Sequence, residues 1–133
     1  MPNDHNRVSI YGSLVHQVTG HNPTSVSLHS SHPIESDEEI YQRSPPEPVG
    51  QTPTKVDFGW VEDPIAIILR NLSDEHTIML GEEIAPGSVN ALPFCAPPGM
   101  STVLFIANYT TMNPLLMWVV GGEALYSITA VPR

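Results

Sequence analysis

The chain has 133 residues and a formal net charge of −9 at pH 7, with 41% hydrophobic residues, values that suit one domain of ordinary size. Five basic residues against 14 acidic ones exclude a basic face for nucleic acid and a polybasic membrane anchor, because both need clustered Lys and Arg. One cysteine, Cys95, excludes an intramolecular disulfide and any Cys-rich metal site.

The first residues show no basic segment followed by an apolar one, so we expect no cleaved signal peptide and synthesis in the cytoplasm. The longest apolar stretches, residues 65–69 and 115–120, are far shorter than the roughly 20 residues that cross a bilayer, so no transmembrane segment is expected. The glycosylation sequons at Asn71 and Asn108 are interpreted as chance matches.

Composition changes near residue 57. Seven of the 14 prolines and five of the six histidines precede this point, whereas most apolar residues follow it. A segment poor in apolar residues cannot offset its own ordering entropy by burial. We therefore predict an extended polar arm with short strands at residues 1–55 and a β-sandwich domain at residues 56–133, which is expected to fold without the arm.

Alternating polar and apolar residues predict short strands within the arm. Residues 7–11 alternate, Gly12-Ser13 is compatible with a turn, and residues 14–18 are apolar enough for a return strand. Residues 24–29 alternate again, and residues 33–54 are acidic and rich in proline. Two interpretations stay open: the strands fold back on the same chain, or they extend the sheet of a neighbouring subunit.

The second half predicts consecutive strands separated by turns. The strands are expected at residues 65–72, 76–80, 89–94, 101–109, 114–120 and 123–131. Turns are expected at residues 71–75, 85–88 and 95–99, and Gly121-Gly122 predicts a tight hairpin turn. This spacing is typical of a small antiparallel β-sandwich, Greek-key or jelly-roll-like, with little helix. Trp118, inside an apolar run, is expected in the core.

The histidines do not predict a metal site. His16, His21, His29 and His32 lie on separate Ser-rich segments, with no cysteine nearby and no carboxylate before Glu35. A contact surface whose charge changes near pH 6 is the better-motivated role.

Catalytic motifs are also lacking in the sequence. Cys95 has apolar neighbours and no adjacent base, which favours an inert buried thiol. The sequence has no nucleophile elbow and no phosphate-binding loop. We expect no catalytic residues, no cofactor and no enzymatic activity.

Apolar side chains on the arm and on the loop rim predict protein contacts. The candidate contact residues are Val8, Ile10, Tyr11, Val26, Leu28, Trp60, Tyr109 and Met112.

The second half resembles the actinoporin-like β-sandwich, a family of lipid-binding pore formers. The landmarks that carry the resemblance are residues 65–67, Asn71, Ser73, Leu92-Pro93, Pro98-Gly99, Leu104-Phe105, residues 116–118, Ala124-Leu125 and Val131-Pro132. The chain departs from that family in lacking its amphipathic N-terminal helix. The resemblance implies an alternative function, a sandwich that binds membrane lipid or glycan at a membrane surface.

The leading hypothesis is a non-enzymatic structural or assembly protein. A virion coat, minor capsid or capsid-cementing component fits best, with an arm that binds copies of the same chain or other shell proteins. Because the chain is acidic, we expect no direct contact with the nucleic acid of such a particle.

Overall fold

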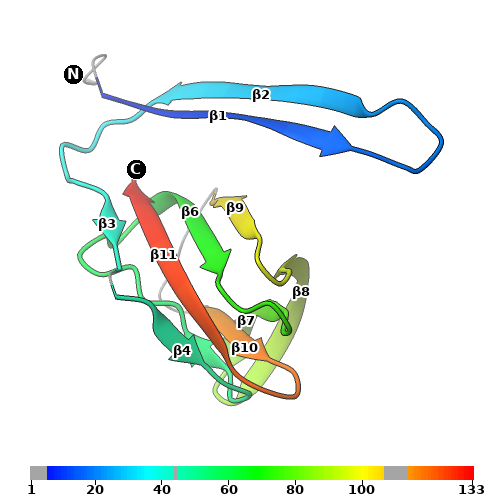
Figure 1. Ribbon diagram of the computed structural model, residues 1–133. Helices are drawn as coiled ribbons and strands as arrows, with labels where there is room; N and C mark the ends of the chain where they lie inside the picture. Colours follow the sequence, from blue (N-terminus) through cyan, green and yellow to red (C-terminus); the bar gives the residue numbers. More distant parts are fainter. Residues whose placement is uncertain (1–5, 44, 107–113) are drawn as a thin grey trace. The chain divides into compact units, whose positions relative to one another are not determined.

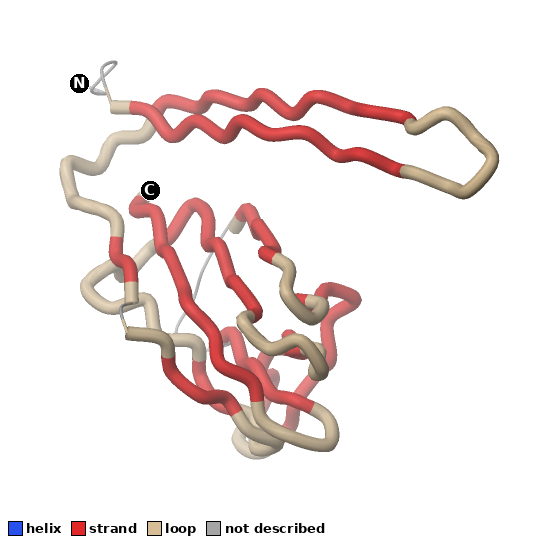
Figure 2. Tube along the Cα trace, in the orientation of Figure 1, coloured by secondary structure: helices blue, strands red, loops and turns tan. Residues whose placement is uncertain are grey.

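A computed structural model describes residues 6–43, 45–106 and 114–133 of the chain. These residues form eleven strands and no helix (Figures 1 and 2). They divide into two compact units, Met1–Asp37 and Glu38–Arg133. The prediction of an all-β fold with a small antiparallel sandwich is confirmed.

The first unit is a long β-hairpin. Strands β1 (Arg7–His16) and β2 (Thr24–Pro33) pair antiparallel along their whole length. At the open end of the hairpin, the Asn6 side-chain amide donates to the Ser36 carbonyl over 2.9 Å.

The turn expected at Gly12-Ser13 is wrong. Both residues lie inside β1, where Gly12 pairs with Leu28 and Ser13 with Ser27. Gly12 does not have a positive φ, whereas Gly20, in the loop that joins the two strands, has a φ of 86°. Since β1 continues to His16, residues 14–16 extend the first strand, and the return strand is β2.

The described residues of the second unit form nine strands, all in antiparallel pairs. They are β3 (Tyr41–Gln42), β4 (Glu47–Val49), β5 (Thr54–Lys55), β6 (Pro64–Asn71), β7 (Ile78–Ala85), β8 (Ser88–Ala96), β9 (Ser101–Phe105), β10 (Leu115–Val119) and β11 (Ala124–Pro132). The strand expected at residues 101–109 is described as far as Phe105, and residues 107–109 lie outside the described part.

The strand order of the second unit is that of a jelly roll. One sheet, here called the first sheet, has the order β3-β11-β6-β9, and β4 also pairs with β11. The second sheet has the order β5-β10-β7-β8. If β3 and β4 are taken as one interrupted edge strand, the chain changes sheet between all successive strands except β7 and β8. Eight strand positions arranged in this way form the double-sheet jelly roll.

The core lies between the two sheets of this unit. Ile67 and Leu69 of the first sheet and Ile78 and Leu80 of the second are all fully buried. Ile68 and Arg70 of β6 and Met79 of β7 are less buried, as expected for the other face of such strands, whereas the small residues Ala66 and Gly81 are buried too. Residues 65–69 are all apolar, so the inner face of β6 is distinguished by burial in the sandwich and not by polar–apolar alternation in the sequence.

The boundary between the two units differs from the expected one at residues 55 and 56. Residues 38–55 contribute β3, β4 and β5 to the edges of the sandwich, and Val49 is part of its core. Arg43 forms ion pairs with Glu47 and with Asp57, and the Arg43–Asp57 distance is 2.6 Å. Removal of residues 1–55 would therefore take strands, a core residue and Arg43 away from the sandwich.

Gly121-Gly122 does not form the expected tight hairpin. The strands on either side of it, β10 and β11, belong to different sheets and do not pair with each other. Gly121 has a φ of 82°, a conformation that favours glycine, so the local prediction of a turn is correct. The turn carries the chain across the sandwich instead of back along the same sheet.

Trp118 is partly buried and is not part of the central core, contrary to expectation. It lies on the outer face of the second sheet, because its neighbours Met117 and Val119 fill the core. A Cβ atom at Gly81 would lie 2.7 Å from the indole ring, so the ring packs directly over the Gly81 backbone. Trp118 is thus a packing residue on the outside of the sheet.

Asn71 is fully buried and bonds three backbone groups. Its amide donates to the carbonyls of His76, over 2.6 Å, and Ala96, over 2.9 Å, while its oxygen accepts from the Ser73 backbone N–H. These bonds fix the connection between β6 and β7 against the end of β8. Because the amide is buried and occupied, Asn71 is not an accessible glycosylation site in this fold, consistent with a chance sequon.

Candidate functional site

The hairpin has one apolar and one polar face. Residues paired directly across an antiparallel ribbon lie on the same face, and successive residues alternate between faces. In this register the even-numbered residues of both strands share one face. We call its apolar members, Val8, Ile10, Leu14, Val26 and Leu28, the apolar hairpin face.

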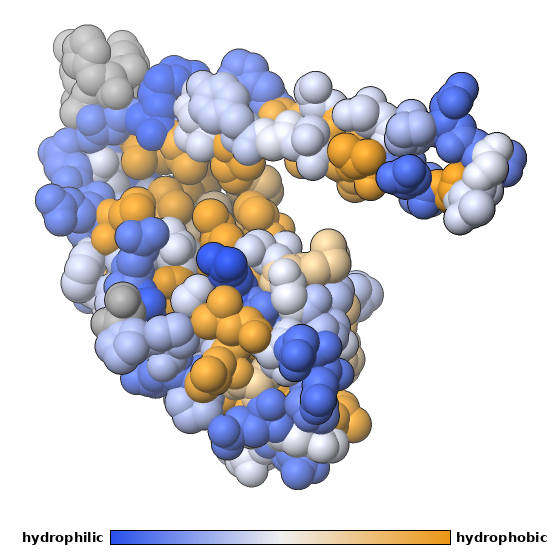
Figure 3. Space-filling model, in the orientation of Figure 1, coloured by the Kyte–Doolittle hydropathy of each residue, from blue (hydrophilic) through white to orange (hydrophobic). Residues whose placement is uncertain are grey.

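The apolar hairpin face carries no acidic, lysine or arginine side chain. The remaining residues on the same side of the hairpin are Gly12, His16, Thr24, Ser30 and His32. Leu14 is 57% exposed, Val26 52% and Leu28 55%. The space-filling view shows apolar surface along one side of the hairpin and mainly polar surface along the other (Figure 3). A charge-free face with three large exposed aliphatic side chains is typical of a surface that binds another apolar surface.

The opposite face of the hairpin is mainly polar, with five serines, Arg7 and one ring pair beside Pro33 and the exposed Val15. The Ser31 hydroxyl accepts from Arg7 Nε over 2.9 Å, and the Ser9 hydroxyl lies 3.0 Å from the Ser31 hydroxyl. The rings of Tyr11 and His29 are stacked, with centroids 4.6 Å apart. These polar contacts suit a surface in water, and they leave the two sides of the hairpin with opposite character.

The structure describes six of the eight predicted contact residues. Val8, Ile10, Val26 and Leu28 come together on the apolar hairpin face, and Tyr11 lies on the opposite face. Tyr109 and Met112 lie outside the described residues.

Trp60, the remaining described contact residue, belongs to the sandwich. Its indole N–H donates to the Glu39 carbonyl over 2.9 Å, and its ring meets Tyr41 edge-on with centroids 5.0 Å apart. The ring holds residues 39–41 in place but is still an exposed side chain.

Leu14 is the member of the apolar hairpin face that sequence reasoning missed. Leu14 is separated from Val8 and Ile10 by an even number of residue steps, so a continuous strand puts all three on one face. This spacing is the signal that could have identified it. Interpreting Gly12-Ser13 as a turn interrupted this alternation and assigned Leu14 to a separate strand.

The histidines of the hairpin lie at different places. His16 and His32 are at opposite ends of the apolar hairpin face, whereas His29 is on the polar face. Within residues 6–43, 45–106 and 114–133, no group of three or more His, Cys, Asp or Glu side chains is arranged to hold a metal ion.

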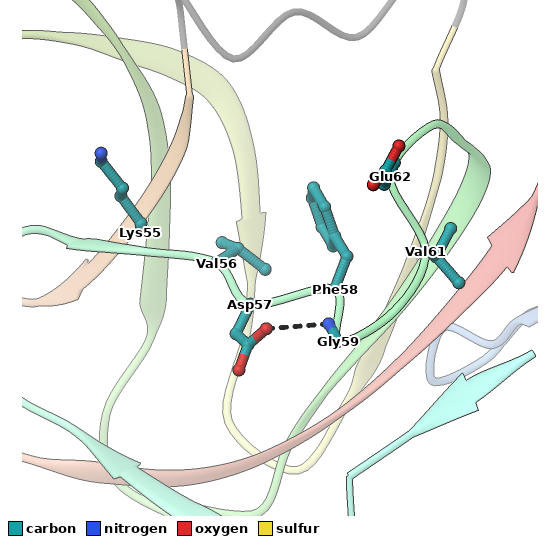
Figure 4. A pocket seen from close by; sticks show the side chains of 7 residues that line it. All are labelled: Lys55, Val56, Asp57, Phe58, Gly59, Val61 and Glu62. Atoms are coloured by element: carbon teal, nitrogen blue, oxygen red, sulfur yellow. Dashed lines mark hydrogen bonds between the residues drawn. The ribbon is translucent and has the colours of Figure 1, made fainter.

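The second unit contains an open cavity of about 660 Å³ beside the loop that follows β5 (Figure 4). Its lining includes Lys55, Phe58 and Glu62, and the Asp57 carboxylate accepts from the Gly59 backbone N–H over 2.8 Å. Asp57 is also paired with Arg43, so its charge is used to fix the loop. The lining residues of this cavity include no Ser, Thr, Cys or His.

Cys95 is partly exposed on β8 and not fully buried as expected. Its carbonyl accepts from the Thr102 hydroxyl over 2.7 Å, which ties β8 to β9.

Comparisons with protein-family models, curated protein sequences and solved structures gave no significant match to this chain. Across the described residues, no helix has the length and apolar character needed to span a membrane. The function is therefore argued from the hairpin and the sandwich themselves.

Proposed function

We propose that this chain is a non-enzymatic assembly protein whose N-terminal hairpin binds neighbouring copies, as in a virion coat, a minor capsid protein or a capsid-cementing protein. The observation that carries the proposal is the exposed, charge-free apolar hairpin face. A two-stranded hairpin is at best marginally stable in water unless its apolar face is covered. A neighbouring subunit supplies such a cover.

Two further features support an assembly role. Jelly rolls serve as capsid domains as well as lectin domains, although a fold by itself does not fix a function. The acidic chain also suits a position in a protein shell that does not touch nucleic acid. Copies of the same chain are the simplest partners, because an assembly of them needs no second protein.

Sedimentation velocity over a range of protein concentrations tests the proposal with a matched pair of variants. Leu28→Asp places a charge on the apolar hairpin face, and Ser27→Asp places the same charge one residue away on the polar face. We expect the native chain and Ser27→Asp to form a defined oligomer. Leu28→Asp should be monomeric at the same concentrations, because burying an unpaired carboxylate is costly.

A native chain that is monomeric at every concentration would overturn the proposal. If that monomer also sediments with phosphatidylcholine–sphingomyelin vesicles, the result would favour the alternative, a membrane-lipid-binding sandwich. Oligomers that form equally well with Leu28→Asp would remove the hairpin from the interface.

A further inference from the structure

The outer face of the first sheet carries an apolar patch that the sandwich itself does not use. In β6, Ile67 and Leu69 point into the core, so Ala66 and Ile68 lie on the outer face. Ala66 pairs with Phe105 on one side and with Val131 on the other, and Ile68 pairs with Val103. We call Ala66, Ile68, Val103, Phe105 and Val131 the outer apolar patch.

The outer apolar patch is exposed mainly through β9, whereas the small side chain of Ala66, between Phe105 and Val131, is covered by its neighbours. Phe105 is 63% exposed and Val103 is 40% exposed. Thr129 and Gln42 continue the row of Ile68 and Val103, and Arg70 lies in the next row. Near the other end of the patch, the Arg133 guanidinium donates to the carbonyls of Ile106 and Pro64. The outer face of the second sheet differs, because Trp118 already packs there over Gly81.

The two apolar surfaces are suited to packing against each other face to face. Both lie on β-structure with side chains perpendicular to the strands, and two such faces pack about 10 Å apart with interdigitated side chains. Neither surface contains an Asp, Glu, Lys or Arg side chain that would be buried without a partner, and the histidines on the hairpin side, His16 and His32, lie at its two ends. Addition of the hairpin to a sheet edge would leave the apolar hairpin face uncovered, so face packing is the better arrangement.

The size of the hairpin indicates how many such contacts a stable dimer needs. With ten residues in each strand, its face measures roughly 34 Å by 10 Å, at about 3.4 Å per residue and about 4.8 Å between strands. Covering one face removes about 700 Å² from solvent over both surfaces, less than the roughly 1,200–2,000 Å² of stable interfaces. Two contacts related by twofold symmetry reach about 1,400 Å².

We propose that the apolar hairpin face of one copy packs on the outer apolar patch of a second copy, and that the two copies exchange hairpins reciprocally. This inference rests on the proposed function and names the receiving surface. Its occupant is the hairpin of another copy.

Two matched substitutions test the receiving surface. Phe105→Asp charges the outer apolar patch, whereas Phe94→Asp charges a phenylalanine of β8 that is 52% exposed in the other sheet. We expect Phe105→Asp to abolish the dimer and Phe94→Asp to leave it unchanged in sedimentation velocity. Because Phe105 is exposed, the variant is expected to fold, and circular dichroism checks this. Val103→Asp is the second variant of the same patch.

A mixing experiment separates exchange between copies from other effects. Leu28→Asp retains an intact patch, and Phe105→Asp retains an intact hairpin. Each is expected to be monomeric alone. An equimolar mixture should form a one-to-one complex only at higher protein concentration than the native dimer needs, because only one of the two contacts remains. The native chain is measured beside them.

The outcomes distinguish the two proposals. A monomeric native chain overturns the proposed function and with it this inference. A native oligomer that persists in both Phe105→Asp and Val103→Asp overturns the receiving surface alone. A mixture that associates no more than either variant alone, even at the highest protein concentration measured, overturns the exchange of hairpins between copies.

Discussion

The hairpin and the sandwich both consist of strands with an apolar face, with opposite results. In the sandwich, two sheets cover each other, so that Ile67, Leu69, Ile78 and Leu80 are fully buried. In the hairpin, the apolar side chains line one face of a single ribbon, and Leu28 stays 55% exposed. The order of residues in a strand therefore determines which face is apolar, whereas the presence of a second layer determines whether that face is buried.

Truncation tests this comparison with the largest expected effect. Deletion of residues 1–37 should leave a cooperatively folding sandwich, because the core and every strand of the second unit remain. Deletion of residues 1–55 should abolish cooperative unfolding, because β3, β4, β5 and Val49 are lost. Circular dichroism during thermal unfolding measures both. Equal stability of the two truncated chains would contradict the boundary at Asp37.

The same leucine-to-alanine change should have different costs in the two units. Leu69→Ala removes a fully buried side chain and is expected to lower the free energy of unfolding by about 2–5 kcal/mol. Leu28→Ala should change it by about 0.5 kcal/mol or less in the monomer, as at other exposed positions. Urea unfolding at a protein concentration where the chain is monomeric gives both values. A comparable loss in Leu28→Ala would mean that its side chain is buried within the monomer.

Two glycines provide a finer comparison. Gly81→Ala should cost about 1–3 kcal/mol, because the new Cβ would lie 2.7 Å from the Trp118 ring and 2.9 Å from the Asn90 carbonyl oxygen. Gly12→Ala in the hairpin should leave the unfolding transition unchanged, since nothing lies within 4 Å of its Cβ position. Differential scanning calorimetry of both variants checks the pair. An unaltered transition in Gly81→Ala would show that Trp118 moves away freely.

The smallest expected effect is on the pH dependence of stability in alkaline solution, and it compares one buried and one exposed tyrosine. Burial raises the pKa of Tyr126 above its ordinary value of 10.0, and the nearby Arg43 charge only partly opposes this. The folded chain therefore keeps the phenol proton at a pH where the unfolded chain loses it. The stability contributed by Tyr126 is complete below pH 10 and falls as the pH rises through the raised folded-state pKa.

Urea unfolding between pH 8 and pH 11 measures this loss. Tyr126→Phe should weaken the pH dependence, because the phenol is no longer present to ionise. Tyr11→Phe, at a position that is 72% exposed, should follow the native chain. Identical pH profiles for Tyr126→Phe and the native chain would contradict the burial effect.

The candidate site was predictable from the sequence only in part. Val8, Ile10, Val26 and Leu28 were identified because period-2 alternation is a local property of each strand. Their union into one face required the register of β1 against β2, which no local pattern contains. The outer apolar patch is still harder to predict from the sequence, because its members come from β6, β9 and β11. These strands are distant in sequence and adjacent in the sheet.

The sequence by itself determined that the chain forms β-strands, where most strands of the second unit lie, and that it reverses direction near Gly87, Gly99 and Gly121. Alternation and glycine conformation act over a few residues, so they can be recognised locally. Only the tertiary structure decided that β10 and β11 lie in different sheets and that residues 38–55 belong to the sandwich. The strands β3, β4 and β5 are too short to show periodicity, and they owe their place to backbone hydrogen bonds with β10 and β11 and to the burial of Val49.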